Sequence, residues 1–291
     1  MRILIAVDGS DQSYEAARAL RELSPPEEVI LLYVLDVPKP AYPGIDPEIS
    51  ADIYATVEQQ MRNEGERMLD QAASLLTLGS IPLRRHLVVG KPADLILSVA
   101  EKKHVDLIVM GSRGYGPLKE LVLGSVSHRV VSQAHRPVLT VKHPLPRLRH
   151  ALLAVQGQED AQAAIQFAAG KPFREAVDLT VLTAVSFAPP PWPAGGSVAE
   201  AMKEEVLQKA LSFVDEVAAQ LPTDMYRAKA TAIIGTPASV ILNEATKSNS
   251  DLILMGSRGR KGITRRVLGS QCHAVLHQAP CPVLIFPWPG A

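Results

Sequence analysis

One nine-residue stretch occurs twice in the sequence and constrains the fold more than any other feature. Residues 106–114 read Asp-Leu-Ile-Val-Met-Gly-Ser-Arg-Gly, and residues 251–259 repeat them except that Val109 becomes Leu254. Each copy continues to a Gly-Ser pair with the spacing Gly-x2-Gly-x9-Gly-Ser. Two copies with the same spacing and flanks predict an internal duplication, so we expect the 291 residues to form two domains.

The repeated stretch is typical of a phosphate-binding turn. Its apolar start predicts a short buried strand, after which Gly111 and Gly114 allow positive φ and a close approach of main-chain N–H groups to a ligand. Ser125 is a favourable N-cap for a helix over residues 126–131. Free N–H groups and the positive end of the helix dipole would together hold a phosphate. The alternative is that the two glycines form only a tight turn.

Composition and charge narrow the functional classes. Hydrophobic residues make up 47% of the chain and charged residues 21%, as in ordinary globular proteins. The formal net charge of zero argues against a nucleic-acid partner held by a basic face. Cys272 and Cys281 cannot form a disulfide framework and the apolar run 3–7 is too short for a signal peptide, so we expect a cytoplasmic protein. No segment has about 18 consecutive apolar residues, so we expect no membrane span.

Strand and helix patterns alternate along the chain, and this order occurs twice. In the first half we predict strands over 2–7, 29–35, 83–89, 106–110 and 137–141, and helices over 13–23, 50–78, 126–131 and a segment that ends near residue 103. In the second half we predict strands over 150–155, 177–185, 228–234, the second repeated stretch and 282–286, and helices over 159–169 and 198–220. Residues 38–49 and 189–196 are interpreted as proline-rich loops, and residues 142–147 as a stiff linker.

Strands that alternate with helices predict parallel sheets covered on both faces. Each half is therefore expected to be a five-stranded, doubly wound (Rossmann-like) α/β domain. In such a sheet, ligands bind beyond the carboxyl ends of the strands, where the winding direction reverses. If the first and fourth strands are neighbours, Asp8 and Gly111 meet at that crevice. The loops 38–49 and 189–196 follow the second strands, so they leave the same edge and could cover the site.

Three motifs in order resemble the universal stress protein family. They are Val7-Asp8-Gly9-Ser10, Val88-Val89-Gly90-Lys91-Pro92-Ala93 and Gly111-x2-Gly114-x9-Gly124-Ser125. The resemblance covers nearly the whole chain as two tandem domains, residues 1–142 and 148–291, and its motifs are those of the family's ATP-binding branch. It implies two adenine-nucleotide α-hydrolase-like domains with strand order 3-2-1-4-5 that pair through their fifth strands.

The resemblance also implies which residues of the first domain bind ATP. In the family, the aspartate after the first strand and the main chain at the end of the second hold the adenine and ribose, which are Asp8 and Val34 here. The glycines and serine of the long motif hold the ribose and phosphates. The residues expected to form the site are Asp8, Gly9, Ser10, Val34, Met110, Gly111, Arg113, Gly114, Gly124, Ser125 and Val126. The alternatives are that Asp8 is only a turn and cap residue, and that Arg113 and Arg258 are solvated surface charges.

The second domain departs from this pattern at its first motif. Val155-Gln156-Gly157-Gln158 stands where the first domain has Val7-Asp8-Gly9-Ser10, so glutamine replaces the aspartate. The expected counterpart residues are Gln156, Ala184, Met255, Gly256, Arg258, Gly259, Gly269, Ser270 and Gln271. The loop is also more basic, with Arg260, Lys261, Arg265 and Arg266 against Lys119. We therefore expect domain 2 to bind a nucleotide with altered base preference, to bind another anion, or to serve as a structural partner.

A metal site has to be weighed at His273 and His277, which lie four residues apart on a predicted helix with the two cysteines nearby. The first domain has His128 at the place of His273, and no carboxylate accompanies the pair. We therefore expect no metal site, and we interpret the cysteines as small core residues. The loop that contains Trp192 is either a lid or a simple excursion.

Three functions follow from these residues. The first is an ATP-binding stress-response protein whose nucleotide, with or without Mg²⁺, alters its contacts with an unknown protein partner. The second is a slow ATP hydrolase or AMP-forming transferase, in which Asp8 and Asp11 would hold Mg²⁺ or orient water. The sequence lacks Gly-x4-Gly-Lys-Ser/Thr and any evident Ser/His/Asp order, so efficient catalysis is not expected. The third is a structural role for domain 2, which would supply a pairing interface.

Overall fold

The strands form a single ten-stranded sheet in the order β3-β2-β1-β4-β5-β10-β9-β6-β7-β8. The computed structural model describes residues 1–37, 47–77, 79–114, 123–187, 196–257 and 268–287. Strands β1–β5, which we call domain 1, and strands β6–β10, which we call domain 2, are each parallel and have the order 3-2-1-4-5. The predicted fold class, two tandem doubly wound α/β units, is therefore confirmed.

Helices and strands alternate in domain 1 as the sequence pattern predicts. Its elements are β1 (Arg2–Val7), α1 (Asp11–Arg18), η1 (Ala19–Glu22), β2 (Glu28–Leu35), α2 (Pro47–Ser74), β3 (Leu83–Val89), α3 (Pro92–Lys102), β4 (Leu107–Gly111), α4 (Ser125–Gln133) and β5 (Val138–Val141). The helix expected over 13–23 is shorter than predicted, because its last turn tightens into the 3₁₀-helix η1. Helix α2 begins at Pro47, where a missing N–H costs nothing, so residues 47–49 are helix and not loop.

Domain 2 repeats this order with small differences. Its elements are β6 (His150–Ala154), α5 (Gln158–Ala169), β7 (Val177–Val185), α6 (Gly196–Ala219), β8 (Tyr226–Ile234), α7 (Pro237–Lys247), β9 (Leu252–Gly256), α8 (Ser270–Gln278) and β10 (Val283–Phe286). The rest of the predicted loops, residues 38–46 and 189–195 with Trp192, lies outside the described residues.

Alternate residues of the central strands enter two cores on opposite faces of the sheet. Ile3 and Ile5 of β1 pack with helices α1 and α2, whereas Leu4 packs with α3 and α4. The same division continues through domain 2, with α5 and α6 on one face and α7 and α8 on the other. Because both faces are covered, the strands are buried apolar runs, which is why they could be recognised in the sequence.

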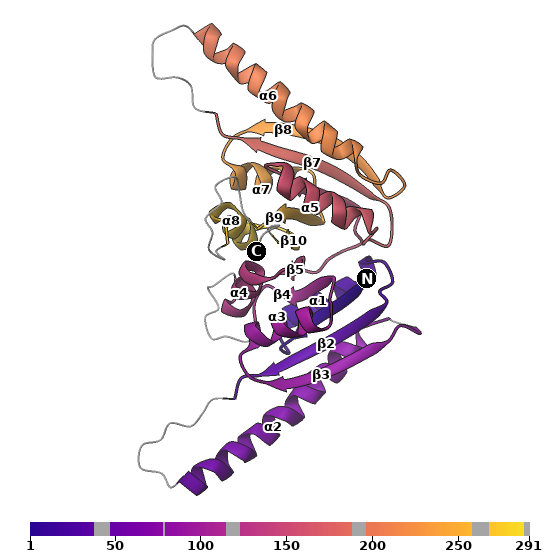
Figure 1. Cartoon of the computed structure of the whole chain (residues 1–291), viewed down its shortest axis with the longest axis vertical. Coiled ribbons are helices and arrows are strands. Elements are labelled where there is room, and N and C mark those ends of the chain that lie inside the picture. Colours follow the sequence, from indigo (N-terminus) through magenta and orange to yellow (C-terminus); the bar gives the residue numbers. More distant parts are fainter. Residues whose placement is uncertain (38–46, 78, 115–122, 188–195, 258–267, 288–291) are drawn as a thin grey trace.

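The two domains join edge to edge in the middle of the sheet. Strand β5 pairs antiparallel with β10, and the Thr140 hydroxyl donates a hydrogen bond to the Val283 carbonyl oxygen at 3.0 Å. On one face, the Ser24 hydroxyl of domain 1 donates to the Phe173 carbonyl oxygen of domain 2 at 2.7 Å. The domains therefore lie end to end, with α2 and α6 at opposite ends of the molecule (Figure 1).

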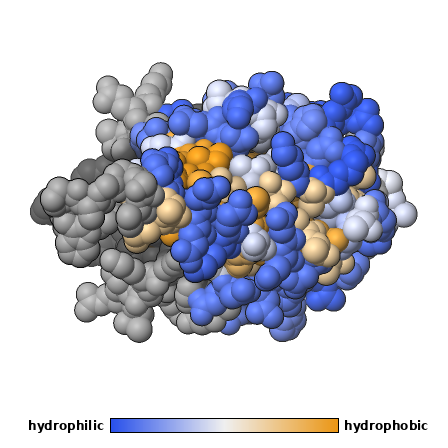
Figure 2. Space-filling view, turned by 90° about the horizontal axis from the view of Figure 1, so that it is seen from above, coloured by the Kyte–Doolittle hydropathy of each residue, from blue (hydrophilic) through white to orange (hydrophobic). Residues whose placement is uncertain are grey.

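The outer surface is mostly hydrophilic where it can be seen from the α6 end (Figure 2). A smaller group of hydrophobic residues lies near the middle of that view. Among the described residues, Ile53, Val89 and Met202 are the large hydrophobic side chains classed as exposed. No described helix combines the length and the hydropathy that a membrane span requires.

Candidate functional site

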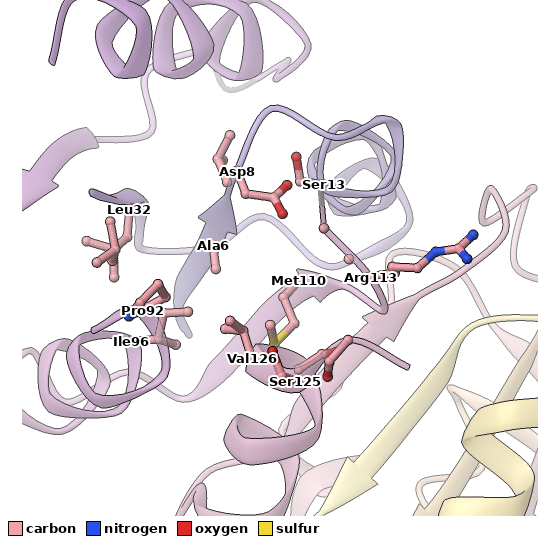
Figure 3. Close-up of a pocket in the computed structure, with 16 residues that line it drawn as sticks. Ala6, Asp8, Ser13, Leu32, Pro92, Ile96, Met110, Arg113, Ser125 and Val126 are labelled. Carbon is pink, nitrogen blue, oxygen red and sulfur yellow. The ribbon is translucent and has the colours of Figure 1, made fainter. Parts of the chain in front are cut away.

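A cavity of about 450 Å³ opens in domain 1 beyond the carboxyl ends of β1, β2 and β4. This size is in the usual range for small-molecule sites. Its lining residues come from these strands, from the turns after β1 and β4, and from helices α1, α3 and α4 (Figure 3). They are Ala6, Val7, Asp8, Ser13, Leu32, Val34, Pro92, Ile96, Met110, Gly111, Arg113, Gly114, Gly124, Ser125, Val126 and Ser127. The cavity thus occupies the switch point at which the doubly wound fold is expected to bind ligands.

Asp8 is held at the end of β1 by the turn that follows it. Its Oδ1 atom accepts hydrogen bonds from the Ser10 backbone N–H at 3.0 Å and from the Ser10 hydroxyl at 2.6 Å. The Ser10 oxygen in turn accepts the Ser13 N–H at 3.2 Å and so caps α1. Ser10 therefore orients Asp8 without lining the cavity, while the exposed carboxylate of Asp8 faces it.

The glycines of the site are needed for space more than for unusual φ angles. Gly111 and Gly114 are not among the described residues with positive φ, so that part of the expectation is wrong. A Cβ atom on Gly111 would lie 3.0 Å from the Gln12 and Ser13 backbone, and one on Gly114 would overlap the Asp8 carboxylate. Gly9 does have a positive φ, 83°, and does not line the cavity. Close approach of the Gln12 and Ser13 backbone explains Gly111, and close approach of the Asp8 side chain explains Gly114.

The first turn of α4 supplies backbone donors at one end of the cavity. Gly124 is the N-cap, and its own N–H donates to the Ser112 carbonyl oxygen at 2.9 Å, so that N–H is already used. The first intrahelical bond runs from His128 N–H to the Gly124 carbonyl oxygen, also at 2.9 Å. The amides of Ser125 and Val126 therefore occupy the positions that a helix leaves without intrahelical acceptors. They are the donors that an anion at this end would meet.

The part of the cavity between β2 and α3 is apolar, and the Val126 side chain borders it although the Val126 amide belongs to the first turn of α4. Leu32 of β2 lies beside Pro92 and Ile96 of α3, and Val126 of α4 lies across from Ile96 (Figure 3). Val34 of β2 also lines the cavity. Met110 contributes its thioether from β4. A flat apolar group fits between these side chains, whereas a charged group would lose its hydration there. The cavity therefore has two chemically different ends.

Burial and the charged groups of this site shift the pKa values of two neighbouring residues, Tyr33 and Lys142. The pKa of Tyr33 is raised by burial and then by the Asp8 carboxylate, and the pKa of Lys142 is lowered by burial and then by Arg113. Arg113 is among the residues that line the cavity, and its guanidinium extends away from the other labelled residues (Figure 3). The side chain of Arg113 is therefore not directed at the ligand space in this conformation.

The equivalent loop of domain 2 is tied to its own backbone. The Asp160 carboxylate accepts hydrogen bonds from the N–H groups of Gln156 at 2.7 Å, Gly157 at 2.8 Å and Ala161 at 3.2 Å. Asp160 is buried, and its pKa is raised by that burial despite the opposing effect of these backbone hydrogen bonds. The carboxylate in this half thus points into the protein, in the first turn of α5.

Gln271 makes a contact that its sequence position does not suggest. Its Oε1 atom accepts a hydrogen bond at 2.9 Å from the backbone N–H of Ala238, in the first turn of α7. Gly269 caps α8 and donates its N–H to the Ser257 carbonyl oxygen at 3.0 Å, as Gly124 does in domain 1. Ala184, Met255, Gly256 and Ser270 lie on the equivalent elements, whereas Arg258, Gly259 and the basic residues 260–266 lie outside the described residues, as does Lys119.

The two histidines weighed as metal ligands meet a third. His273 stacks with His277, and its ring centroid lies 5.7 Å from that of His128 across the domain boundary. Within the described residues, no group of three His, Cys, Asp or Glu side chains could hold a metal ion. Cys272 and Cys281 are buried without a disulfide. Asp11 begins α1 and does not line the cavity.

Seven cavity residues were missed by the sequence reasoning. They are Ala6, Val7, Ser13, Leu32, Pro92, Ile96 and Ser127. A signal was present for part of them, because they lie at strand ends or in the first turns of helices whose neighbours had been selected. Their inward direction depends on the pairing of β1 with β2 and β4, which becomes visible only in the folded sheet.

Comparison with known proteins places these observations in a family. The chain matches the Universal stress protein family twice, over residues 1–142 and 147–287. A universal stress protein of Methanocaldococcus jannaschii is 36% identical over 145 residues, which cover 49% of this chain and 82% of that protein. A universal stress protein of Mycobacterium tuberculosis is 26% identical over 301 residues, which cover 97% of this chain and 96% of that protein.

Solved structures give the same fold over the whole length. The crystal structure of a universal stress protein from Archaeoglobus fulgidus superposes with a TM-score of 0.65 and covers 99% of this chain and 96% of that one. Its sequence identity to this chain is 23%. The arrangement of two tandem units is therefore shared with a solved relative.

Proposed function

The chain belongs to the universal stress protein family, and from this premise we propose that domain 1 is an ATP-binding module whose nucleotide controls contacts with a protein partner. The observation that carries the proposal is the cavity of domain 1, with one apolar end and one end at a helix N-terminus. The sequence motifs that line it match those of the family's ATP-binding branch. We further propose that the protein acts in the cytoplasm during a stress response.

Each part of ATP has a matching part of the cavity. The adenine would lie between Leu32, Ile96 and Val126, with the main chain of Val34 at its edge. The Asp8 carboxylate would accept hydrogen bonds from the ribose hydroxyls, and such bonds are strong because the acceptor is charged. The phosphates would lie against the turn of Gly111 and Gly114 and the amides that open α4, where the helix dipole favours negative charge.

A binding role is favoured over efficient catalysis by the side chains at the cavity. Among the described lining residues, Asp8 is the one carboxylate, and none is a histidine, lysine or cysteine. A general base must lie within hydrogen-bond reach of the group it activates. Asp8 would instead be engaged by ribose, and Asp11 lies outside the lining, so Mg²⁺ would be held mainly by the phosphates. Slow hydrolysis is the alternative function.

Binding and turnover can be measured on the same preparation. Isothermal titration of the nucleotide-free chain with ATP should show binding, and inorganic tripolyphosphate at the same concentration should compete poorly because it lacks the adenine. Phosphate release with Mg²⁺ should be far below the typical enzyme turnover of about 10 s⁻¹. Absence of ATP binding would contradict the proposed function, and turnover near that typical rate would favour the hydrolase.

A further inference from the structure

The two domains use the same residue types at most positions of the cavity. The strand registers and the common motifs align each lining residue of domain 1 with a counterpart in domain 2. Eleven of the sixteen positions carry the same residue type in both halves. The five that differ are Asp8 and Gln156, Ser13 and Ala161, Val34 and Ala184, Val126 and Gln271, and Ser127 and Cys272. Any difference in ligand binding must originate mainly in these five and in the loops around them.

One of the five differences places a side chain across the apolar end of the domain 2 site. In domain 1, Val126 on α4 faces Pro92 and Ile96 on α3 across the open cavity. In domain 2, Gln271 occupies the place of Val126, and its amide oxygen reaches the Ala238 N–H, one residue after the counterpart of Pro92. The side chain of Gln271 therefore bridges the two helices that the cavity separates in domain 1.

This bridge is favourable for the protein when no ligand is present. The Ala238 N–H belongs to the first turn of α7, where backbone donors have no intrahelical acceptor. Thr236, the N-cap residue, makes no side-chain capping hydrogen bond, so Gln271 provides an acceptor that the helix otherwise lacks. A ligand that entered between the helices would have to displace Gln271 and leave a buried donor unsatisfied. Valine at position 126 cannot make such a bond.

A second difference removes the group that would hold the ribose. Gln156 replaces Asp8, and the nearby carboxylate, Asp160, is engaged by three backbone N–H groups of its own loop. Asp160 stands at the place of Gln12 and not of Asp8, so its carboxylate does not replace that of Asp8. The two differences act at adjoining parts of the site.

We infer that Gln271 closes the base-binding half of the domain 2 site, so that each chain holds one adenine nucleotide, in domain 1. This inference rests on the proposed function of domain 1. Gln271 is then the residue that determines which half of the duplicated fold accepts the base. Domain 2 retains the other features of the motif, including Gly269 and Ser270 at the start of α8, although it binds no adenine base.

Exchange of the two residues tests the inference directly. Val126→Gln should weaken ATP binding by at least about tenfold, because its amide can bridge to the Ala93 N–H. Gln156→Asp with Gln271→Val should create a second site, so that titration finds about two ATP per chain. The same pair combined with Val126→Gln should relocate the single strong site to domain 2. Circular dichroism and thermal unfolding of each variant show that it is folded.

The number of ATP molecules bound by the unmodified chain tests the role of Gln271 separately from ATP binding by domain 1. Nucleotide-free protein should bind about one ATP in a calorimetric titration. Two ATP per chain would overturn the role of Gln271 and leave the proposed function standing, whereas none would overturn the proposed function itself. Unchanged affinity in folded Val126→Gln, or a single site in the folded Gln156→Asp, Gln271→Val chain, would also overturn the inference.

Discussion

The two halves of this chain share a fold and differ in the side chains at a few positions of the site. In domain 1, the Asp8 carboxylate and the first turn of α4 face an open cavity. In domain 2, glutamines stand at the places of Asp8 and Val126, and one of them, Gln271, accepts a hydrogen bond from the backbone of its own domain. Two copies of the same fold can therefore differ in ligand binding, because binding depends on a few side chains at the site and not on the fold.

The helices beside the cavity are also joined in two different ways. In domain 1, Arg129 of α4 forms an ion pair with Asp94 of α3 at the surface. The counterparts in domain 2 are Ala274 and Ser239, which cannot form that pair, and Gln271 joins α8 to α7 instead. An ion pair outside the cavity leaves the space between the helices open, whereas a bridge between their first turns fills it.

The largest difference between the two halves is expected at the N-cap glycines of α4 and α8. In Gly124→Val, the added Cβ would lie 3.4 Å from the Arg113 Cα and from the Ser127 Oγ, so the larger side chain should displace the turn that would hold the phosphates. We therefore expect ATP affinity to fall by about 100-fold or more. Gly124 has φ −70° and ψ 154°, an extended conformation that valine adopts, so the chain should still fold. Gly269→Val is the matched control in domain 2, and calorimetry should find its ATP affinity unchanged. Equal losses in both variants would contradict a single site in domain 1.

A smaller difference between the two halves is expected at the residues that follow β1 and β6. Asp8→Ala should weaken ATP binding by about tenfold, because the ribose loses a charged acceptor. Gln156→Ala, the same change at the equivalent place, should leave ATP affinity as it is. Titration of both variants at the same ionic strength checks the pair. If Gln156→Ala proves as harmful as Asp8→Ala, both halves take part in binding.

A pH effect is expected where the two halves meet. The pKa of His128 is lowered by burial and then by the neighbouring His273. Well above the ordinary histidine pKa of about 6.5, His128 is neutral in both the folded and the unfolded chain. As the pH falls below this value, the unfolded chain binds the proton more readily than the folded chain, so the free energy of unfolding decreases. His128→Gln should lose less stability than the unmodified chain between pH 7.5 and 5.5 in denaturant titrations. His135→Gln, a change at an exposed histidine of the same domain, should not alter that slope.

The smallest effect is expected from the links between the helices. Arg129→Ala should lower the free energy of unfolding by less than about 1 kcal/mol, since both side chains of its ion pair are 45% exposed. Gln271→Ala should cost about 1 kcal/mol or more, because it leaves the Ala238 N–H in a buried residue without its acceptor. Chemical denaturation compares the two variants. The reverse order would mean that Gln271 does not hold α7 and α8 together.

The fold class could be predicted from the sequence because the signals for it are local. Buried strands such as Ile3–Val7 form continuous apolar runs, and the glycine motif marks the turn after the fourth strand in both halves. The sequence also pointed to Asp8 and Val126, which the structure places at one cavity. That prediction of the site residues depended on the family motifs, because the cavity is built from elements about one hundred residues apart in the sequence.

Other features could not be predicted, because they depend on contacts between distant segments. Gln271 was expected at the site as a counterpart of Val126, but its bond to Ala238 requires α7 and α8 to be placed side by side. The meeting of His128 with His273 requires the edge pairing of β5 and β10. The hydrogen bond from the Gly124 N–H to the Ser112 carbonyl oxygen could not be predicted either, because it joins two backbone groups in an irregular turn.

The measurement that tests the central claim most directly is a count of the nucleotide that the protein carries. The purified chain would be saturated with ATP, freed of unbound nucleotide by rapid gel filtration and denatured, and the released nucleotide would be quantified per chain by chromatography. The account predicts about one ATP per chain, and none from the Gly124→Val variant. Two ATP per chain, or one that persists in Gly124→Val, would contradict the assignment of nucleotide binding to domain 1 alone.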